Sequence, residues 1–149
     1  MIATQTSSQV INIITSRFGP LAITEDKIIN FVQGMPGFQR LRRFILIDHD
    51  AEGIFKWLQA VDDPTVAFLL TNPNSYKPDY MVPIRKIDIE TLGIRSASAL
   101  VTLVMVCISS DNEMSLNLKG PVLFNSDNMK AMQFIIDRED YLTHYAIAV

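Results

Sequence analysis

The sequence is poor in the residues on which metal sites and enzyme active sites most often depend. Its 149 residues include one cysteine, Cys107, and two histidines, His49 and His144. One cysteine cannot form a disulfide within the chain, and two histidines so far apart match neither a metal-ligand spacing nor a catalytic triad. A disulfide-stapled fold, a metal site and histidine catalysis are therefore not predicted.

The single cysteine lies in an apolar stretch, Val104–Ile108. Free cysteine is among the most buried residue types, so we interpret Cys107 as a buried structural thiol rather than a nucleophile. A lone thiol also suits a reducing cytoplasm.

The chain also lacks a long apolar run, an export signal and a basic surface. Its longest uncharged apolar run, Leu100–Ile108, is about half of the ~20 residues that a membrane-spanning helix needs. The N-terminus has neither the basic region nor the apolar block of a signal peptide. A net charge of −3 argues against nucleic acid as a direct partner. We expect a cytoplasmic protein that contacts neither membrane nor nucleic acid directly.

Catalytic and phosphate-binding motifs are missing as well. The sequence has no glycine-rich phosphate loop, no G-x-S-x-G elbow and no C-x-x-C pair. Two acidic clusters, Asp48–Glu52 and Asp62-Asp63-Pro64, are interpreted as turns, because neighbouring residues at strand ends point in alternating directions. No cofactor, metal or small-molecule substrate is predicted.

The densest positive cluster consists of Arg40, Arg42 and Arg43. It could bind RNA or an acidic patch on a partner. A solvated turn is the preferred interpretation, because the rest of the chain supplies no matching basic surface.

What the chain does contain is a high proportion of apolar residues. Hydrophobic residues make up 48% of the sequence and charged residues 19%, which is too apolar for disorder. The length fits one domain. We predict a single domain over residues 1–149, with residues 1–15 as a partly flexible N-terminal segment.

The chain is organised around Phe55–Pro73, which holds the only tryptophan. Apolar residues on either side of Asp62-Asp63-Pro64 predict a β-hairpin. Trp57 is expected to fill the core, in which case Trp57→Ala would destabilise the protein by about 3–5 kcal/mol.

The remaining periodicity predicts a mainly β protein, a compact antiparallel β-barrel-like or sandwich domain with one or two short helices. One helix is expected over Ile84–Leu92, stopped by Gly93. Met129–Ile136 fits a helix or a strand, and the β context favours a strand. Other strands are predicted at Val10–Thr15, Leu21–Ile23, Lys27–Val32, Phe44–Asp48, Leu100–Ile108 as a central strand, Met114–Leu118, Val122–Asn125 and within Asp137–Val149.

Several large apolar side chains fall in segments that are expected to be loops. They are Met35, Phe38, Tyr76, Tyr80 and Met81. Either these loops pack onto the sheet or the side chains contact a partner, because monomers rarely leave a large apolar patch bare. A protein-binding module is therefore favoured over an enzyme. The alternative is a small β-fold ligand-binding protein or an enzyme of unknown substrate.

Several sequence blocks, taken together and in order, resemble the flagellar assembly factor FliW family of bacteria. These blocks are Phe31–Phe38, Phe44–Ile47, Phe55 with Trp57-Leu58-Gln59, Asp62-Asp63-Pro64, Ala67-Phe68, Pro78-Asp79-Tyr80 and Asn117–Pro121. They cover the chain from about Ser16 to its end. Gln33 stands where the family pattern has Pro-Glu.

This resemblance implies a non-enzymatic cytoplasmic protein of all-β, barrel-like fold with two protein partners. One is flagellin and the other is the RNA-binding translational regulator CsrA. Proteins of this family hold CsrA off the flagellin messenger, and unexported flagellin takes them away. Flagellin synthesis would then follow export by partner switching.

Overall fold

The computed structural model describes residues 9–148 of the chain. The predicted flexible start falls largely on residues 1–8, which lie outside the described residues, whereas Val10–Thr15 form a strand as predicted. The strands of the described part are β1 Val10–Thr15, β2 Gly19–Thr24, β3 Ile29–Phe31, β4 Arg43–Asp48, β5 Phe55–Ala60, β6 Ala67–Thr71, β7 Leu100–Ile108, β8 Met114–Leu116, β9 Val122–Asn125, β10 Lys130–Gln133 and β11 Tyr145–Ile147. The helix is α1, Lys86–Leu92, and short 3-10 turns lie at Glu25–Lys27, Pro73–Ser75 and Ala97–Ala99.

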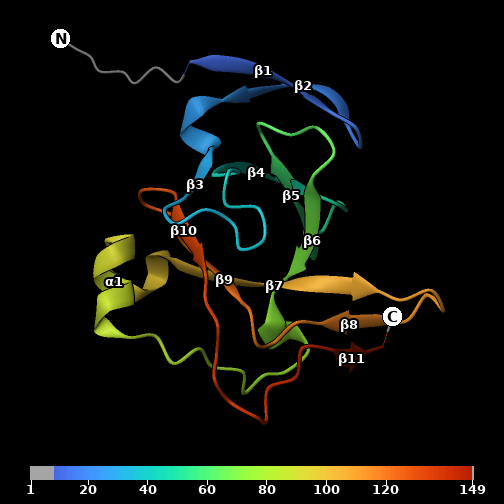
Figure 1. Ribbon diagram of the computed structural model, residues 1–149, viewed down its shortest axis with the longest axis vertical. Coiled ribbons are helices and arrows are strands. Elements are labelled where there is room, and N and C mark those ends of the chain that lie inside the picture. The colour runs from blue at the N-terminus through green and yellow to red at the C-terminus, as the bar shows by residue number, and fades with distance from the viewer. Residues whose placement is uncertain (1–8, 149) are drawn as a thin grey trace.

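Seven of these strands form a closed ring, in the order β7, β6, β5, β4, β3, β10, β9 and back to β7 (Figure 1). The mainly β prediction is confirmed. The expectation of a purely antiparallel arrangement was wrong at one place, because β3 and β10 pair in parallel. A parallel pair needs a long crossover connection, and the chain from β4 to β9 provides it.

Alternating side chains of the ring strands fill its inside and cover its outside. On β7, Leu103 packs into the inner cluster with Phe44 and Leu58, whereas Val104 packs into an outer cluster with Leu116. This alternation follows from the period of two in a β-strand. Because both faces of β7 are covered over part of its length, its sequence is almost continuously apolar.

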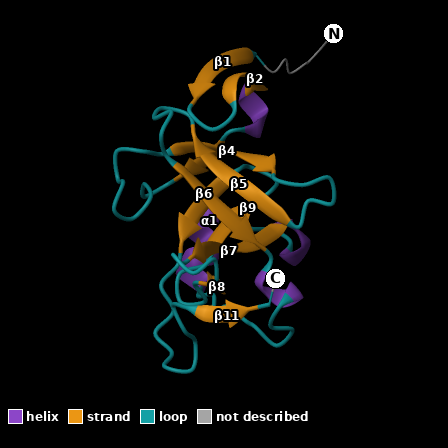
Figure 2. Ribbon diagram, turned by 90° about the vertical axis from the view of Figure 1, so that its right-hand side faces the viewer, coloured by secondary structure: helices purple, strands orange, loops and turns teal. Residues whose placement is uncertain are grey.

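Two additions cover the outside of the ring at opposite ends of the molecule (Figures 1 and 2). The β1–β2 hairpin packs Ile13 against Ile45 and Val61. At the other end, the chain that precedes and includes α1, strands β8 and β11 and the C-terminal loops pack around Val104 and Leu123. These clusters share ring strands, and the single domain over residues 1–149 stays a prediction.

Helix α1 begins two residues after the predicted start and ends where Gly93 was expected to stop it. Asp88 accepts hydrogen bonds from the Arg85 backbone N–H and guanidinium, both at 2.9 Å, which caps the N-terminus and lowers the pKa of Asp88. Gly93 ends the helix with a φ of 65°. The buried Asn125 donates to the carbonyl oxygens of Leu92 and Gly93, which ties the helix end to β9.

The expectation that Trp57 fills the core was wrong. Trp57 is half-buried on the outer face of β5, whereas its neighbour Leu58 is 1% exposed inside the ring. Phe18 packs edge-on against the indole, with ring centroids 6.4 Å apart, and Arg17 stacks over it at 3.9 Å. The period-two pattern allowed either face of β5 to be the inner one, and the β1–β2 hairpin covers Trp57 only in part.

The structure therefore predicts that Leu58→Ala destabilises the protein more than Trp57→Ala. Removal of a fully buried leucine costs about 2–5 kcal/mol, because a cavity remains. The loss at Trp57 should be about 1–2 kcal/mol, since solvent already reaches the indole. Urea unfolding of both variants would measure the difference, and a larger loss for Trp57→Ala would contradict this assignment.

The loop Gly34–Gly37 supplies a second prediction. Both glycines have positive φ, 74° and 82°. A Cβ on Gly34 would lie 2.5 Å from the Gln39 carbonyl oxygen, whereas a Cβ on Gly37 would meet nothing within 4 Å.

Gly37→Ala should therefore cost only the backbone strain, about 1–2 kcal/mol. Gly34→Ala should cost more, because overpacking adds a further ~1–3 kcal/mol. Thermal unfolding of the pair would test this, and equal losses of stability would show that the close approach at Gly34 is not significant.

Candidate protein-binding surface

The first two predicted contact residues, Met35 and Phe38, lie in the loop between β3 and β4. Met35 is 1% exposed and packs inside the ring, so its side chain does not face solvent. Phe38 is 38% exposed and packs edge-on against Phe68, with centroids 5.7 Å apart. Of the two, only Phe38 offers a partner an accessible surface.

The other three predicted residues lie between β6 and α1, and the five do not form one exposed patch, because Met35 and Tyr80 are buried in different clusters. Tyr80 is buried, and its hydroxyl donates to the Leu118 carbonyl oxygen at 2.7 Å. Burial raises the pKa of Tyr80, which therefore stays neutral. Tyr76 is half-buried against the same outer cluster, and Met81 is 70% exposed. Contact of Phe38, Tyr76 and Met81 with a partner stays a prediction.

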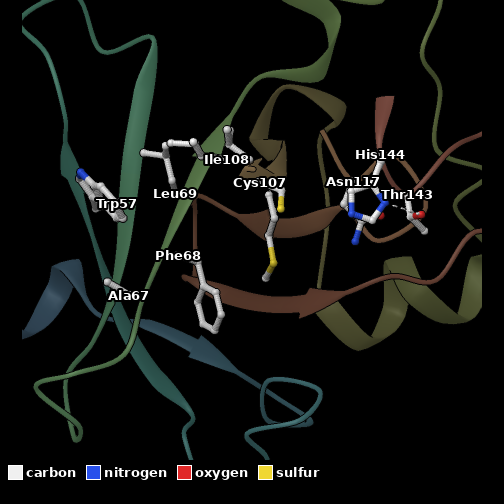
Figure 3. A pocket seen from close by; sticks show the side chains of 11 residues that line it. Trp57, Ala67, Phe68, Leu69, Cys107, Ile108, Asn117, Thr143 and His144 are labelled. Carbon is white, nitrogen blue, oxygen red and sulfur yellow. Dashed lines mark hydrogen bonds between the residues drawn. The ribbon is translucent and has the colours of Figure 1, made fainter. Parts of the chain in front are cut away.

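The clearest apolar hollow is one that the sequence did not predict. It lies where β6 and β7 separate, and we call it the β6–β7 groove. Residues 67–69 of β6 and 105–108 of β7 line it, together with Trp57, Asn117 and residues 143–144 (Figure 3). Its volume of about 460 Å³ is within the range of typical ligand pockets.

The groove exists because β6 and β7 pair over only two positions. Leu70 is opposite Met105 and Thr71 is opposite Val104, and the pairing stops there. Beyond that point β6 continues with β5, and β7 continues with β8. The two strands diverge, and the space between them opens to solvent.

The groove walls carry no Asp, Glu, Lys or Arg side chain. Ile108 is 55% exposed, and Cys107 is exposed beside it. Trp57 forms part of the opposite wall, and its indole N–H donates to His49 Nδ1 at 3.1 Å. Such a surface favours apolar contact rather than recognition of an ion.

Cys107 corrects a sequence prediction. We expected a buried thiol, but Cys107 is exposed. The apolar stretch does form a strand, as predicted, but the prediction that it is buried does not hold as far as Cys107. Leu103 and Val104 are core residues, whereas β7 projects beyond the ring at Cys107 and Ile108.

Two arginines of the cluster form ion pairs with the two aspartates of the Asp62-Asp63 turn. Arg43 binds Asp62 with contacts of 2.6 and 3.1 Å, and Arg40 lies 3.3 Å from Asp63. The hydrogen bond from Arg43 lowers the pKa of Asp62, and the Thr65 hydroxyl is the main cause of the lowered pKa of Asp63. Arg40 and Arg43 are therefore paired, whereas the exposed Arg42 donates to the Val32 carbonyl oxygen. The turn interpretation of the acidic pair is confirmed.

Within residues 9–148, no group of three or more His, Cys, Asp and Glu side chains is placed to hold a metal ion. None of His49, Asp62 and Asp63 lines the β6–β7 groove. None of the described helices has the length and apolar character needed to cross a bilayer.

Comparison with known proteins identifies relatives of this fold and sequence. The family model described as FliW protein matches residues 12–147. The chain belongs to the FliW family. It is 36% identical over 135 residues to "Flagellar assembly factor FliW" of Caldanaerobacter subterraneus subsp. tengcongensis. This match covers 89% of this chain and 90% of the relative. It is 40% identical over 136 residues to the protein of the same name from Alkaliphilus metalliredigens, with 89% and 84% covered.

A solved structure supports the same assignment. The chain superimposes on a crystal structure of the flagellar assembly factor FliW with a TM-score of 0.83 and 29% sequence identity. The match covers 91% of this chain and 95% of the other.

Several of the blocks that resemble FliW have structural roles in this FliW-family chain. The buried Gln59 amide donates to the carbonyl oxygens of Ala60 and Val66, which holds the β5–β6 turn. Asn117 accepts from the backbone N–H groups of Lys119 and Gly120. A Cβ on Gly120 would lie 2.8 Å from the Gln133 amide. Gln59 and Gly120 therefore stabilise turns and are not candidates for partner contact, whereas Asn117 also lines the β6–β7 groove.

The exposed thiol makes a prediction for this FliW-family chain. Cys107 should react with one equivalent of a maleimide in the native protein, because its sulfur is open to solvent. Mass spectrometry would count the label, and circular dichroism would confirm that the fold is kept. Labelling that requires denaturant would contradict the exposed position.

Proposed function

We propose that this chain binds flagellin and antagonises the translational regulator CsrA by partner switching in the cytoplasm. Free chain would hold CsrA, and newly made flagellin would take the chain away and release CsrA. Flagellin translation would then be coupled to export. The observation that carries this proposal is membership of the FliW family over residues 12–147, whose named relatives are flagellar assembly factors.

The surface chemistry supports a protein-binding role. The β6–β7 groove is apolar and uncharged, and Ile108 and Met81 are exposed apolar side chains at 55% and 70%. Exposed apolar surface of this kind is typical of sites that contact other proteins. The paired arginines are consistent with a role that acts on CsrA as a protein rather than on its RNA target.

The alternative, a ligand-binding protein or enzyme, has less support. Asp62, Asp63 and His49, which could have supplied acid–base chemistry, are used elsewhere, and His144 lines the β6–β7 groove with no Asp or Glu beside it there. Asp62 and Asp63 pair with arginines, and His49 accepts from Trp57. A catalytic site needs such groups to converge on one hollow.

A competition experiment tests the proposal. The tagged chain is loaded with CsrA on a resin, and flagellin is then added in increasing amounts. We expect CsrA to leave as flagellin binds, because switching requires a coupling of ~1–3 kcal/mol between the two partners, or about 5–150-fold in affinity. The reverse order, flagellin first and CsrA second, should give the same coupling.

Resin without the chain is the control for non-specific binding. Simultaneous retention of both partners, with neither affinity changed, would contradict partner switching while leaving both binding activities in place. Failure to retain either partner would overturn the whole proposal.

A further inference from the structure

The β6–β7 groove has two walls that are strand edges with unused backbone groups. In an antiparallel ladder, the N–H and C=O groups of successive residues point to opposite sides of the strand. The Met105 carbonyl accepts from the Asn117 N–H, and the Ser109 N–H donates to the Glu113 carbonyl. Odd-numbered residues of this stretch therefore face the β8 side. Val106 and Ile108 direct their backbone groups into the groove.

The same reasoning applies to the opposite wall. The Val66 carbonyl accepts from the Ala60 N–H, so Val66 and Phe68 face β5. Ala67 and Leu69 then direct their backbone groups toward the groove. Leu70 and Met105 form a non-hydrogen-bonded pair, so the last bond of the β6–β7 ladder joins the Val106 N–H to the Leu69 carbonyl oxygen. The next pair, Ala67 with Ile108, is not formed.

These edges also lack the usual protection. Open strand edges are normally blunted by lysine, proline, a bulge or a covering segment, because they pair readily with other chains. Residues 67–69 and 106–108 contain neither lysine nor proline. The hollow between them is not filled by any part of the chain that the structure describes.

We propose that the β6–β7 groove binds an extended segment of a protein partner as an added β-strand along the edge of β7. The backbone of the segment would pair with the N–H and C=O groups of Ile108 and with the C=O group of Val106. Its side chains would pack on the apolar walls, and the three or four residues inside the groove would be uncharged. This inference rests on the proposed function, because it names the way in which the partner is held.

Charge at the rim defines the partner further. Arg17 stacks on Trp57 at the rim and, within the described part of the chain, forms no ion pair. It also borders an adjoining hollow with Ala67 and Thr65. An acidic residue at that end of the segment would complement this guanidinium. The expected occupant is therefore an apolar extended stretch with a carboxylate at one end.

The test uses flagellin as the probe and compares two substitutions at one position. Ile108→Pro removes the N–H that faces the groove without removing a bond to β8, whereas Ile108→Val keeps the N–H and most of the side chain. Titration by calorimetry should show binding weakened at least ~10-fold by Ile108→Pro, which corresponds to about 1.4 kcal/mol. Ile108→Val should stay within ~2-fold of the unmodified chain.

A second measurement does not depend on the folding of a variant. Cys107 is the only cysteine and lies between Val106 and Ile108, so its maleimide labelling rate reports directly on the groove. Saturating flagellin should slow the labelling at least ~10-fold. A substitution of equally exposed surface elsewhere, Ile87→Lys on α1, should change neither affinity nor labelling.

The outcomes separate the two proposals. Flagellin binding that persists in Ile108→Pro, with Cys107 still reactive in the complex, would overturn the groove assignment and leave the proposed function intact. If the unmodified chain does not bind flagellin, the proposed function fails, and this inference fails with it. If light scattering shows that the unmodified chain is a dimer and Ile108→Pro is a monomer, the occupant is a second copy of the chain, which also overturns the proposal.

Discussion

The pairing of β7 is the constraint on which the rest of the structure depends. This nine-residue strand pairs with β9 through its first half, with β6 at two central positions and with β8 through its last three residues. The contacts with β9 and β6 close the ring around Phe44, Leu58 and Leu103. The contact with β8 draws the end of β7 away from β6. Closure of the core and opening of the groove therefore have the same origin.

The two parts of β7 have different roles: its first part closes the core, and its end lines the exposed groove. Ring closure buries Leu103 and Val104, whereas Cys107 and Ile108 at the end of the strand are exposed. A ring also removes most free strand edges, and the segment where β7 leaves it is an exception. Partner recognition by strand addition would use backbone groups that the fold itself does not need.

Much of the fold could be predicted from local sequence. Period-two alternation predicted β5, the turn at Lys119-Gly120-Pro121 bounded β9, and Gly93 marked the end of α1. What the sequence did not supply was long-range pairing. The parallel β3–β10 contact, the inward face of β5 and the exposure of Cys107 all depend on which strands meet. The contact candidates were selected as apolar loop residues, and Met35 proved to be buried inside the ring and Tyr80 in the outer cluster. The sequence did not predict the groove, because its edges belong to strands whose apolar sequences indicate buried core strands.

Amide hydrogen exchange on the free chain tests the central claim most directly. The account predicts a contrast between neighbouring residues of one strand, in which the Cys107 amide exchanges slowly because it bonds toward β8 and the Ile108 amide exchanges quickly because it faces the open groove. Nuclear magnetic resonance would resolve these two amides. Equally slow exchange at Cys107 and Ile108 would mean that the edge is already paired, and it would contradict the account.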